Sequence, residues 1–256
     1  MRRLSFRSTG FPVWRGSDVF DEYMPQIRAE AISAFPREAV WLITAAGCRQ
    51  VENVHEDPEH YFSVAESEVR RSLAETLLAV VHSHPSNIAA PSASDMQGQV
   101  NTAVPWAIVA TDGVTCSDVV WWGPGVQMAP LVGRGFRHGT SDCYSLIRDY
   151  YALKKGTDLK EFPRDWLWWE AGETLFVDGF AEAGFVRIDE SEARPGDVWL
   201  AQIRSSTPNH GGILLDDCLT LHQPGGKVQV EPSKISVREP IFRYMRHITH
   251  WLRYVG

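Results

Sequence analysis

The stretch Thr76–Asp95, TLLAVVHSHPSNIAAPSASD, holds the pattern that decides the fold of the first half of this chain. Its opening residues are almost all apolar, which predicts a buried strand that ends near His82. Pro and Asn then mark a loop, and Ser92 or Ser94 is a suitable N-cap for a helix that begins beside them. The segment therefore predicts a strand, a loop and a helix in that order.

Three side chains of this stretch are suited to hold a metal ion. Residues i and i+2 of a strand point the same way, so His82 and His84 can reach one ion, and Asp95 follows in the first turn of the expected helix. Two imidazoles and one carboxylate leave a fourth tetrahedral position open, which is typical of catalytic zinc sites that activate water at neutral pH. Zinc is the expected metal, although another divalent ion can use these ligands. A His-x-His pattern taken alone more often reflects two unrelated histidines.

The spacing of the whole motif is more specific than the two histidines. His-x-His is followed by seven residues, a Ser, two residues and an Asp. This pattern resembles the motif of the JAMM metallopeptidases. The resemblance implies that His82, His84 and Asp95 bind zinc and that Ser92 helps to hold the tetrahedral intermediate.

The same resemblance implies a glutamate upstream that takes a proton from water. Helical periodicity predicts a helix over 17–34, and an apolar run predicts a buried strand over 39–43. Glu38 lies at their junction and is the implied base, whereas Glu30 is expected to face solvent. The family usually has Gly three residues after this Glu, and here Trp41 stands there. We expect Trp41 to crowd the site.

The composition indicates a soluble globular protein and argues against nucleic-acid binding and membrane insertion. The 256 residues suffice for one large domain or two ordinary ones, and 44% hydrophobic with 22% charged residues is typical of soluble globular proteins. The net charge of −7 argues against nucleic acid as a partner. No run approaches the length of a transmembrane helix, so we expect no membrane insertion. Most of the ten tryptophans are expected in the core, with sugar or protein contacts as the alternative.

The cysteines do not form a recognisable framework. Cys48, Cys116, Cys143 and Cys218 lack the spacing of a disulfide scaffold or a zinc cage. Three of them are expected to be small core residues. The exception is Cys143.

A segment rich in Gly and Pro divides the chain. We expect a first domain over 1–122, a linker over 123–132 and a second domain over 133–256, in a two-domain α+β fold. The first domain is expected to be mixed α/β, and the second to place helices before an antiparallel sheet. The expected strands are 104–110 and 114–122 in the first domain and 197–203, 210–215, 219–222 and 227–230 in the second, while 241–255 fits helix or strand.

Cys143 belongs to a second chemical pattern. It is expected in the first turn of a helix after an N-cap at Ser141 or Asp142, where the macrodipole favours thiolate. His210 opens one expected strand and His222 ends the next, so a hairpin brings the two together. Such a pair supplies a base and the residue that orients it, and we expect the base to lower the pKa of the thiol further. A single Cys with scattered His is, in general, more often a buried thiol.

The order of these residues resembles that of the NlpC-type cysteine peptidases over about residues 133–235. The resemblance rests on the Asp-Cys pair, on PGDVWL at Pro195–Leu200, on NHGGIL at Asn209–Leu214 and on His222. It implies a papain-like α+β core that cleaves peptidoglycan stem peptides. By the same resemblance, Cys143 is the nucleophile, His210 the base and His222 the orienting residue. Two departures are Tyr144-Ser145 in place of the usual Ser-Gly and Leu214 where Tyr is common.

The two patterns in one chain resemble a family of tail assembly proteins of lambda-like bacteriophages. The resemblance implies assembly in the host cytoplasm, a place in the virion tail tip and action at the bacterial cell wall or periplasm. Its implied partners are other tail tip proteins and peptidoglycan stem peptides. A hydrolase with two active sites is the leading hypothesis. The alternatives are a structural or chaperone component of the tail tip with residual sites, and a cellular peptidase of the deubiquitinase or sulfur-transfer type.

Overall fold

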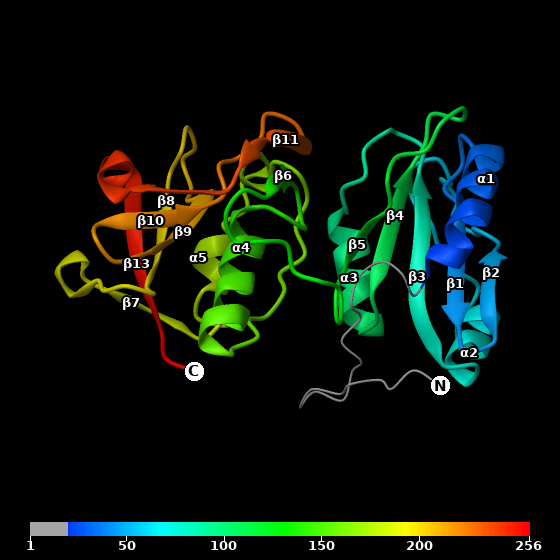
Figure 1. Cartoon of the computed structure of the whole chain (residues 1–256), viewed down its shortest axis with the longest axis horizontal. Coiled ribbons are helices and arrows are strands. Elements are labelled where there is room, and N and C mark those ends of the chain that lie inside the picture. Colours follow the sequence, from blue (N-terminus) through cyan, green and yellow to red (C-terminus); the bar gives the residue numbers. More distant parts are fainter. Residues whose placement is uncertain (1–19) are drawn as a thin grey trace. The chain divides into compact units, whose positions relative to one another are not determined.

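The computed structural model describes residues 20–256, which form two compact units of mixed helices and strands (Figure 1). Contacts group the residues through Ala90 with Gln97–Gln127 in the first unit, and Pro91–Met96 with Met128–Gly256 in the second. The change from one unit to the other after Gln127 falls within the Gly- and Pro-rich segment 123–132. The fold is α+β, as the sequence predicts.

The first unit contains a five-stranded sheet in the order β2-β1-β3-β4-β5. Strands β3 and β4 run parallel, and the other neighbours are antiparallel. The strands are β1 (Val40–Thr44), β2 (Gly47–Val51), β3 (Leu77–His84), β4 (Trp106–Ala110) and β5 (Val120–Trp122). The helices are α1 (Met24–Ala34), α2 (Glu66–Ala74) and α3 (Ala93–Thr102), of which the first turn of α3, through Met96, is grouped with the second unit. A short 3-10 turn, Asp21–Tyr23, precedes α1, and residues 17–19 of the expected helix lie outside the described residues.

The two faces of this sheet carry separate cores, and Trp41 and His82 lie on different faces. Trp41 is fully buried with the apolar residues of α1, and its Nε1 donates to Glu30 Oε2 at 2.6 Å. Val40 pairs with His82 across β1 and β3, so these two side chains share the opposite face. The expectation that Trp41 crowds the histidine site is therefore wrong. Glu30 is also not the solvent-facing residue we expected, because its carboxylate accepts the hydrogen bond from the Trp41 indole.

Strand β5 is shorter than the predicted 114–122. Asp112 Oδ1 accepts hydrogen bonds from the backbone N–H groups of Val114 and Thr115 at 2.9 and 2.7 Å. This Asp-centred turn bends the chain away from the extended conformation. The strand consequently begins only at Val120.

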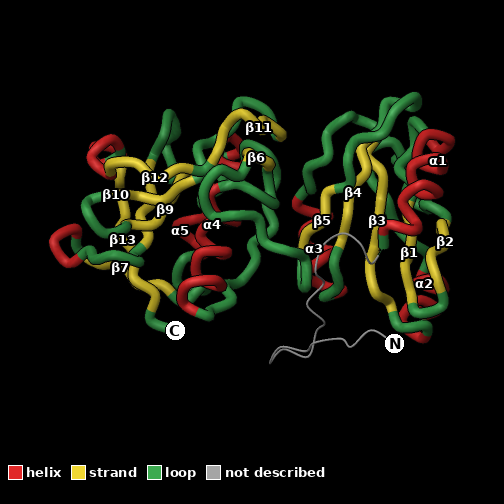
Figure 2. Tube along the Cα trace, in the orientation of Figure 1, coloured by secondary structure: helices red, strands yellow, loops and turns green. Residues whose placement is uncertain are grey.

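The second unit contains a six-stranded antiparallel sheet in the order β12-β10-β9-β8-β13-β7 (Figure 2). A separate pair joins β6 (Gly135–Arg137) to β11 (Val230–Ile235). The six strands are β7 (Phe185–Ile188), β8 (Val198–Ala201), β9 (His210–Leu214), β10 (Leu219–His222), β12 (Val237–Pro240) and β13 (Ile248–Tyr254). Helix α4 (Cys143–Tyr150) continues as a π-helical turn over Tyr151–Lys155, and α5 spans Leu175–Gly179. Short 3-10 turns lie at Trp168–Ala171, Glu190–Glu192, Ile241–Arg243 and Met245–His247.

Several strand predictions for this unit need correction. The expected strand 227–230 begins only at Val230 and pairs with β6, so it is not part of the main sheet. Strands β7 and β12 were not expected. The undecided segment 241–255 forms two 3-10 turns followed by β13, which lies between β8 and β7. The local periodicity of residues 248–254 does not reveal that this strand pairs with β8 and β7, which lie far away in the sequence.

The amphipathic helix α4 is anchored to the sheet by its apolar side. Leu146 and Ile147 pack with Ile213 and Leu221 in one core, which holds the helix against β9 and β10. Cys218 is exposed, so the expectation that it is a core residue is wrong. Among the tryptophans of the described chain, the buried ones are Trp41, Trp106, Trp122, Trp168, Trp199 and Trp251.

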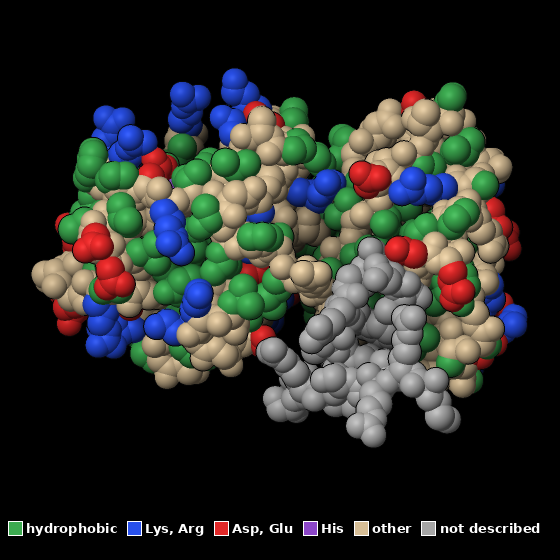
Figure 3. Space-filling view, in the orientation of Figure 1, with side chains coloured by type: hydrophobic (Ala, Val, Ile, Leu, Met, Phe, Trp, Pro, Cys, Tyr) green, Lys and Arg blue, Asp and Glu red, His purple; other side chains and the backbone are tan. Residues whose placement is uncertain are grey.

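The surface is charged unevenly. On the face shown in Figure 3, acidic and basic side chains are interspersed in the first unit, whereas several Lys and Arg side chains project along one edge of the second. The formal net charge of the chain is −7, so this edge has a local charge opposite to that of the whole. Within the described residues, no helix has the length and apolar character to cross a bilayer.

Candidate functional site

The three expected metal ligands lie together. One ligand atom from each of His82, His84 and Asp95 falls within 4.8 Å of the others, and all three side chains are buried. Strand β3 carries both histidines at its end, with side chains on neighbouring positions of one face. Helix α3 begins with Ala93 and places Asp95 in its first turn.

Hydrogen bonds orient these ligands. His84 Nδ1 lies 3.0 Å from the Ile88 carbonyl oxygen, which requires a proton on Nδ1 and leaves the lone pair on Nε2. The Nε2 atoms of His82 and His84 are 3.0 Å apart. Phe62 and Trp106 pack against the His82 ring at 4.9 and 5.8 Å between centroids. The site therefore combines polar ligands with an apolar wall.

Ser92 and Glu38 both lie at this cluster. Ser92 is the N-cap of α3: its hydroxyl accepts from Asp95 N–H at 3.2 Å and donates to Asp95 Oδ2 at 2.7 Å. Its own N–H donates to the same oxygen at 2.8 Å. Glu38 is buried at the start of β1, and its Oε1 is 3.9 Å from His84 Nε2. The four side chains expected from the sequence and the implied base thus come together.

These residues fit a zinc ion. Zinc binds imidazole nitrogen at about 2 Å and carboxylate oxygen at a similar distance, so two nitrogens 3.0 Å apart can share one ion. A His ligand whose other nitrogen donates to a backbone carbonyl is a common feature of metal sites, and His84 has it. His82, His84 and Asp95 would hold the ion, with Glu38 beside it.

The second candidate site begins at the first residue of α4, which is Cys143. Asp142 is the N-cap, and its Oδ1 accepts from Ser145 N–H at 2.9 Å. Of the two N-cap candidates, the structure therefore selects Asp142. The half-buried thiol of Cys143 lies beside the backbone N–H groups of Gly211 and Tyr144, which hydrogen-bond to it. Gly211 follows His210 in β9, so Cys143 and His210, the expected nucleophile and base, lie in the same region of the unit.

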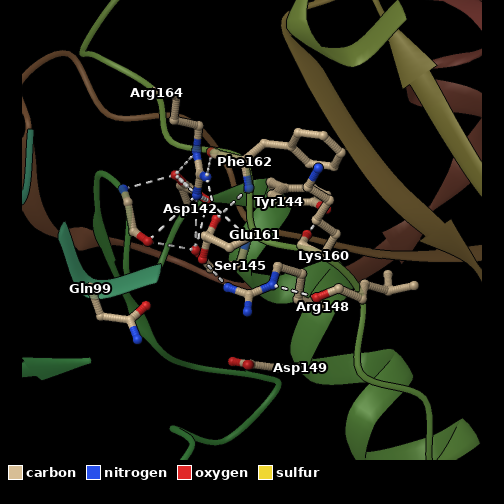
Figure 4. Close-up of polar contacts among 12 residues, drawn as sticks. Gln99, Asp142, Tyr144, Ser145, Arg148, Asp149, Lys160, Glu161, Phe162 and Arg164 are labelled. Atoms are coloured by element: carbon tan, nitrogen blue, oxygen red, sulfur yellow. Dashed lines mark hydrogen bonds and ion pairs between the residues drawn. The ribbon is translucent and has the colours of Figure 1, made fainter. Parts of the chain in front are cut away.

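A buried ion network holds the N-cap in place (Figure 4). Arg164 Nη2 donates to both carboxylate oxygens of Asp142, at 3.0 Å to Oδ1 and 2.9 Å to Oδ2. Its Nη1 donates to Glu161 Oε1 at 2.8 Å. Burial alone would raise the pKa of Asp142, but the Arg164 charge, His138 and the backbone N–H groups of Ser145 and Gly139 together outweigh it and hold that pKa well below its usual range. Sequence reasoning missed this network, because Arg164 lies in an irregular loop.

His210 and His222 meet as the predicted hairpin requires. His222 pairs with Gly212 across β10 and β9, and the His210 Nε2 and His222 Nδ1 atoms are 3.0 Å apart. An alanine Cβ at Gly212 would lie 2.6 Å from the Trp199 ring and 2.8 Å from His222 Cβ. Only glycine leaves room for both neighbours there.

Two further residues that the sequence did not suggest complete this cluster. Glu239 Oε1 lies 2.7 Å from His222 Nε2 and accepts from the Tyr244 hydroxyl at 2.7 Å. The Tyr244 ring stacks on Trp199 at 5.2 Å between centroids. A polar chain therefore continues from His210 through His222 to a carboxylate.

The protonation of the nucleophile differs from our expectation. Burial, with the nearby Asp142 charge, raises the pKa of Cys143 to about 12, despite opposing hydrogen bonds from Gly211 and Tyr144. Burial and the neighbouring His222 lower the pKa of His210 to about 3. The expected lowering of the thiol pKa is thus wrong for the resting state. With the thiol pKa raised and the imidazole pKa lowered, both groups are neutral at neutral pH.

Comparisons with known proteins agree with this architecture. Residues 133–247 match the NlpC/P60 family, and residues 20–122 match the prokaryotic homologs of the JAB domain. The NlpC/p60 domain of the peptidoglycan hydrolase SagA is a solved structure with 17% identity and a TM-score of 0.33, covering 48% of this chain and 89% of that chain.

Two curated proteins are similar over most of the chain. Tail tip assembly protein K of Escherichia phage N15 is 29% identical over 210 residues, which cover 77% of this chain and 82% of that protein. Tail tip assembly protein K of Escherichia phage lambda is 34% identical over 176 residues, which cover 69% of this chain and 80% of that protein. With a JAB-like domain followed by a cysteine-peptidase domain of the NlpC/P60 family, the chain belongs to the family of tail tip assembly protein K.

Proposed function

We propose that this protein acts in the assembly of a phage tail tip and cleaves peptidoglycan stem peptides there, with Cys143, His210 and His222 as the reacting triad. The observation that carries the proposal is the His210–His222 hydrogen bond next to a thiol at the first residue of α4. The names of the relatives and the NlpC/P60 match support the tail and the murein substrate. Other tail tip proteins and the murein of the host cell wall are the proposed partners.

The Cys143 thiol and the His210 imidazole are both neutral at rest, so the proton leaves sulfur only during the attack on the substrate. Cys143 Sγ attacks the carbonyl carbon of the stem peptide while its proton passes to His210. The oxyanion is held in part by the Cys143 backbone N–H, which has no intrahelical acceptor in the first turn of α4. His210 then gives the proton to the leaving amine, which departs and leaves a thioester. Water attacks the thioester, passes a proton through His210 back to sulfur, and releases the carboxylate.

The cluster of His82, His84 and Asp95 supports a second proposed activity, a zinc-dependent peptidase. His82, His84 and Asp95 would hold zinc, which, when bound, polarises water and substrate carbonyls. Glu38 is placed to accept a proton near His84, and Ser92 orients the Asp95 carboxylate. The proposed bond type is a peptide or isopeptide bond, in a tail protein or in murein.

The decisive experiment treats purified sacculi with the protein and identifies the released muropeptides by mass spectrometry. We expect stem-peptide fragments with wild type and with Cys218→Ala, whose thiol is exposed. Fragments should be absent with Cys143→Ala, and His84→Ala should leave them unchanged. If wild type releases no fragments, alone or in the assembled tail tip, the structural alternative replaces the hydrolase proposal.

The metal proposal is tested by elemental analysis. Purified protein should carry about one zinc per chain, and His84→Ala should lose it, because two remaining ligands bind zinc weakly. His60→Ala is the matched control, since His60 is exposed and contacts Asp57 rather than the cluster. Full zinc occupancy in His84→Ala would place the metal elsewhere.

A further inference from the structure

Glu239 occupies a defined place beside the proposed triad. It pairs with Thr220 across β12 and β10, and His222 lies two residues further along β10 on the same face. His222 in turn pairs with Gly212, which shares its face with His210. The three polar side chains therefore form a row across three adjacent strands. The β-sheet register, rather than a flexible loop, sets their spacing.

The protons along this row can be assigned. Burial alone would raise the pKa of Glu239, but hydrogen bonds from Tyr244, His222 and Arg243 together outweigh it and lower that pKa, so the carboxylate is ionised at neutral pH. An ionised carboxylate only accepts, which requires a proton on His222 Nε2, 2.7 Å away. The Tyr244 hydroxyl gives its single proton to the same oxygen.

The assignment continues to the proposed base. Burial lowers the pKa of His222, although Glu239 opposes the shift, so the imidazole is neutral and its Nδ1 is an acceptor. His210 Nε2, 3.0 Å from this atom, must then carry its proton. A neutral His210 has only one such proton, and its lone pair is therefore on Nδ1.

We infer that Glu239, supported by Tyr244, is a positioning residue for the base: through His222 it holds the His210 proton on Nε2 and keeps Nδ1 as the atom that takes the Cys143 proton. The inference rests on the proposed cysteine-peptidase function. It also gives Glu239 a second effect. When His210 becomes cationic during attack, the hydrogen bonds through His222 connect it to the Glu239 carboxylate, which stabilises that charge. The second oxygen of this carboxylate pairs with the exposed Arg243, which weakens the stabilisation without removing it.

Two substitutions of Glu239 separate its effect on the His210 tautomer from its effect on the His210 charge, and a third tests Tyr244. Glu239→Gln keeps an oxygen that accepts from His222 Nε2 but removes the charge. Glu239→Leu removes both. Tyr244→Phe retains the carboxylate and removes the hydroxyl that orients it. Glu170→Gln is the matched control, because Glu170 is an exposed acid in the Trp168–Ala171 turn of the same unit.

The test measures alkylation of Cys143 by iodoacetamide against pH in the full chain, resolved by peptide mass spectrometry. The exposed Cys218 is the internal reference for reagent and pH. We expect Glu239→Leu to slow Cys143 alkylation at neutral pH by about 10- to 100-fold, the range for losing a hydrogen bond to a charged group. Glu239→Gln should fall between Leu and wild type, and Glu170→Gln should match wild type. Nitrogen-15 NMR of the histidines should show His210 with an unprotonated Nδ1 in wild type and a mixture of tautomers in Glu239→Leu.

The outcomes distinguish the inference from the function on which it rests. If His210→Ala slows Cys143 but Glu239→Leu does not, the inference is overturned and the triad stands. If His210→Ala alkylates as wild type does, the proposed function fails and the inference fails with it. A wild-type His210 protonated on Nδ1 also overturns the inference. If Glu239→Leu does not fold, Glu239→Gln and Tyr244→Phe replace it in the same assay, and wild-type rates and pH profiles in both would refute the inference.

Discussion

Replacing Arg164 by Met tests how strongly the buried ion network holds the nucleophile. Met preserves most of the aliphatic volume and removes every donor that Asp142 receives from the guanidinium, three contacts of 2.9 to 3.0 Å. Both side chains are buried. The substitution therefore leaves a buried carboxylate without its cation at the N-cap of α4, held only by the donors of Ser145 and Gly139, directly before Cys143.

The expected loss of stability follows from the burial of this pair. Removing one partner of a buried ion pair costs about 3–5 kcal/mol. In the wild type, the Asp142 pKa is depressed, so the pair contributes stability above the ordinary Asp pKa of about 3.9 and loses it as pH falls below that value. In Arg164→Met, only His138 and the backbone N–H groups of Ser145 and Gly139 still oppose the effect of burial, so we expect the pKa of Asp142 to rise above its ordinary value and the variant to lose stability as pH rises above about 3.9. The gap between the two proteins should therefore widen from acid to neutral pH.

Urea unfolding of the full chain at about pH 4.5 and about pH 7.5, followed by tryptophan fluorescence, measures both effects. Asp142→Asn and the variant with both substitutions complete a double-mutant cycle. We expect this double variant to be more stable than the sum of the two single losses predicts. Arg194→Met is the control, because Arg194 is exposed. The reasoning is refuted if the single losses add within about 0.5 kcal/mol, or if the loss in Arg164→Met is the same at both pH values.

Two further predictions concern the histidine pair. Gly212→Ala should destabilise the second unit and slow Cys143 alkylation, because the new Cβ would lie 2.6 Å from the Trp199 ring; Gly225→Ala, with nothing within 4 Å, should be near neutral in urea unfolding. The pKa of His210 is lowered from 6.5 to about 3, so its neutral form contributes stability above pH 6.5 that is lost as pH falls toward 3. His210→Gln should therefore show a smaller loss of stability than wild type over this range, and an unchanged pH slope would contradict the buried neutral form.

Local patterns in the sequence were sufficient for the elements that carry the two sites. The apolar run before His82 gives β3, and the Ser and Asp that follow give the capped start of α3. His210 and His222 lie in consecutive strands joined by a short turn, so their approach follows from hairpin geometry. In each case the residues that must meet are close in sequence and lie in consecutive elements joined by a short connection.

The residues that the sequence did not reveal depend on longer-range pairing. Glu239 reaches His222 only because β12 pairs with β10 in one register, yet its sequence, VREP, is charged and ends in Pro, which gives no strand pattern. Arg164 comes from a loop and finds Asp142 across 22 residues. The prediction that Trp41 crowds the histidines is wrong for a related reason. Tertiary packing, rather than local sequence, determines which face of β1 lies under α1.

The two sites solve the same chemical problem in the same way. A neutral imidazole has one proton, so its reactive nitrogen is defined only when an acceptor fixes the other. At His84 the Ile88 carbonyl oxygen takes the Nδ1 proton and directs the Nε2 lone pair toward the ligand cluster. At His210 the acceptor is His222 Nδ1, which is itself defined by Glu239. A backbone carbonyl has a single protonation state, whereas a histidine acceptor can switch. We therefore expect the tautomer of His210 to depend on an additional carboxylate, whereas the Nδ1 proton of His84 is fixed without one.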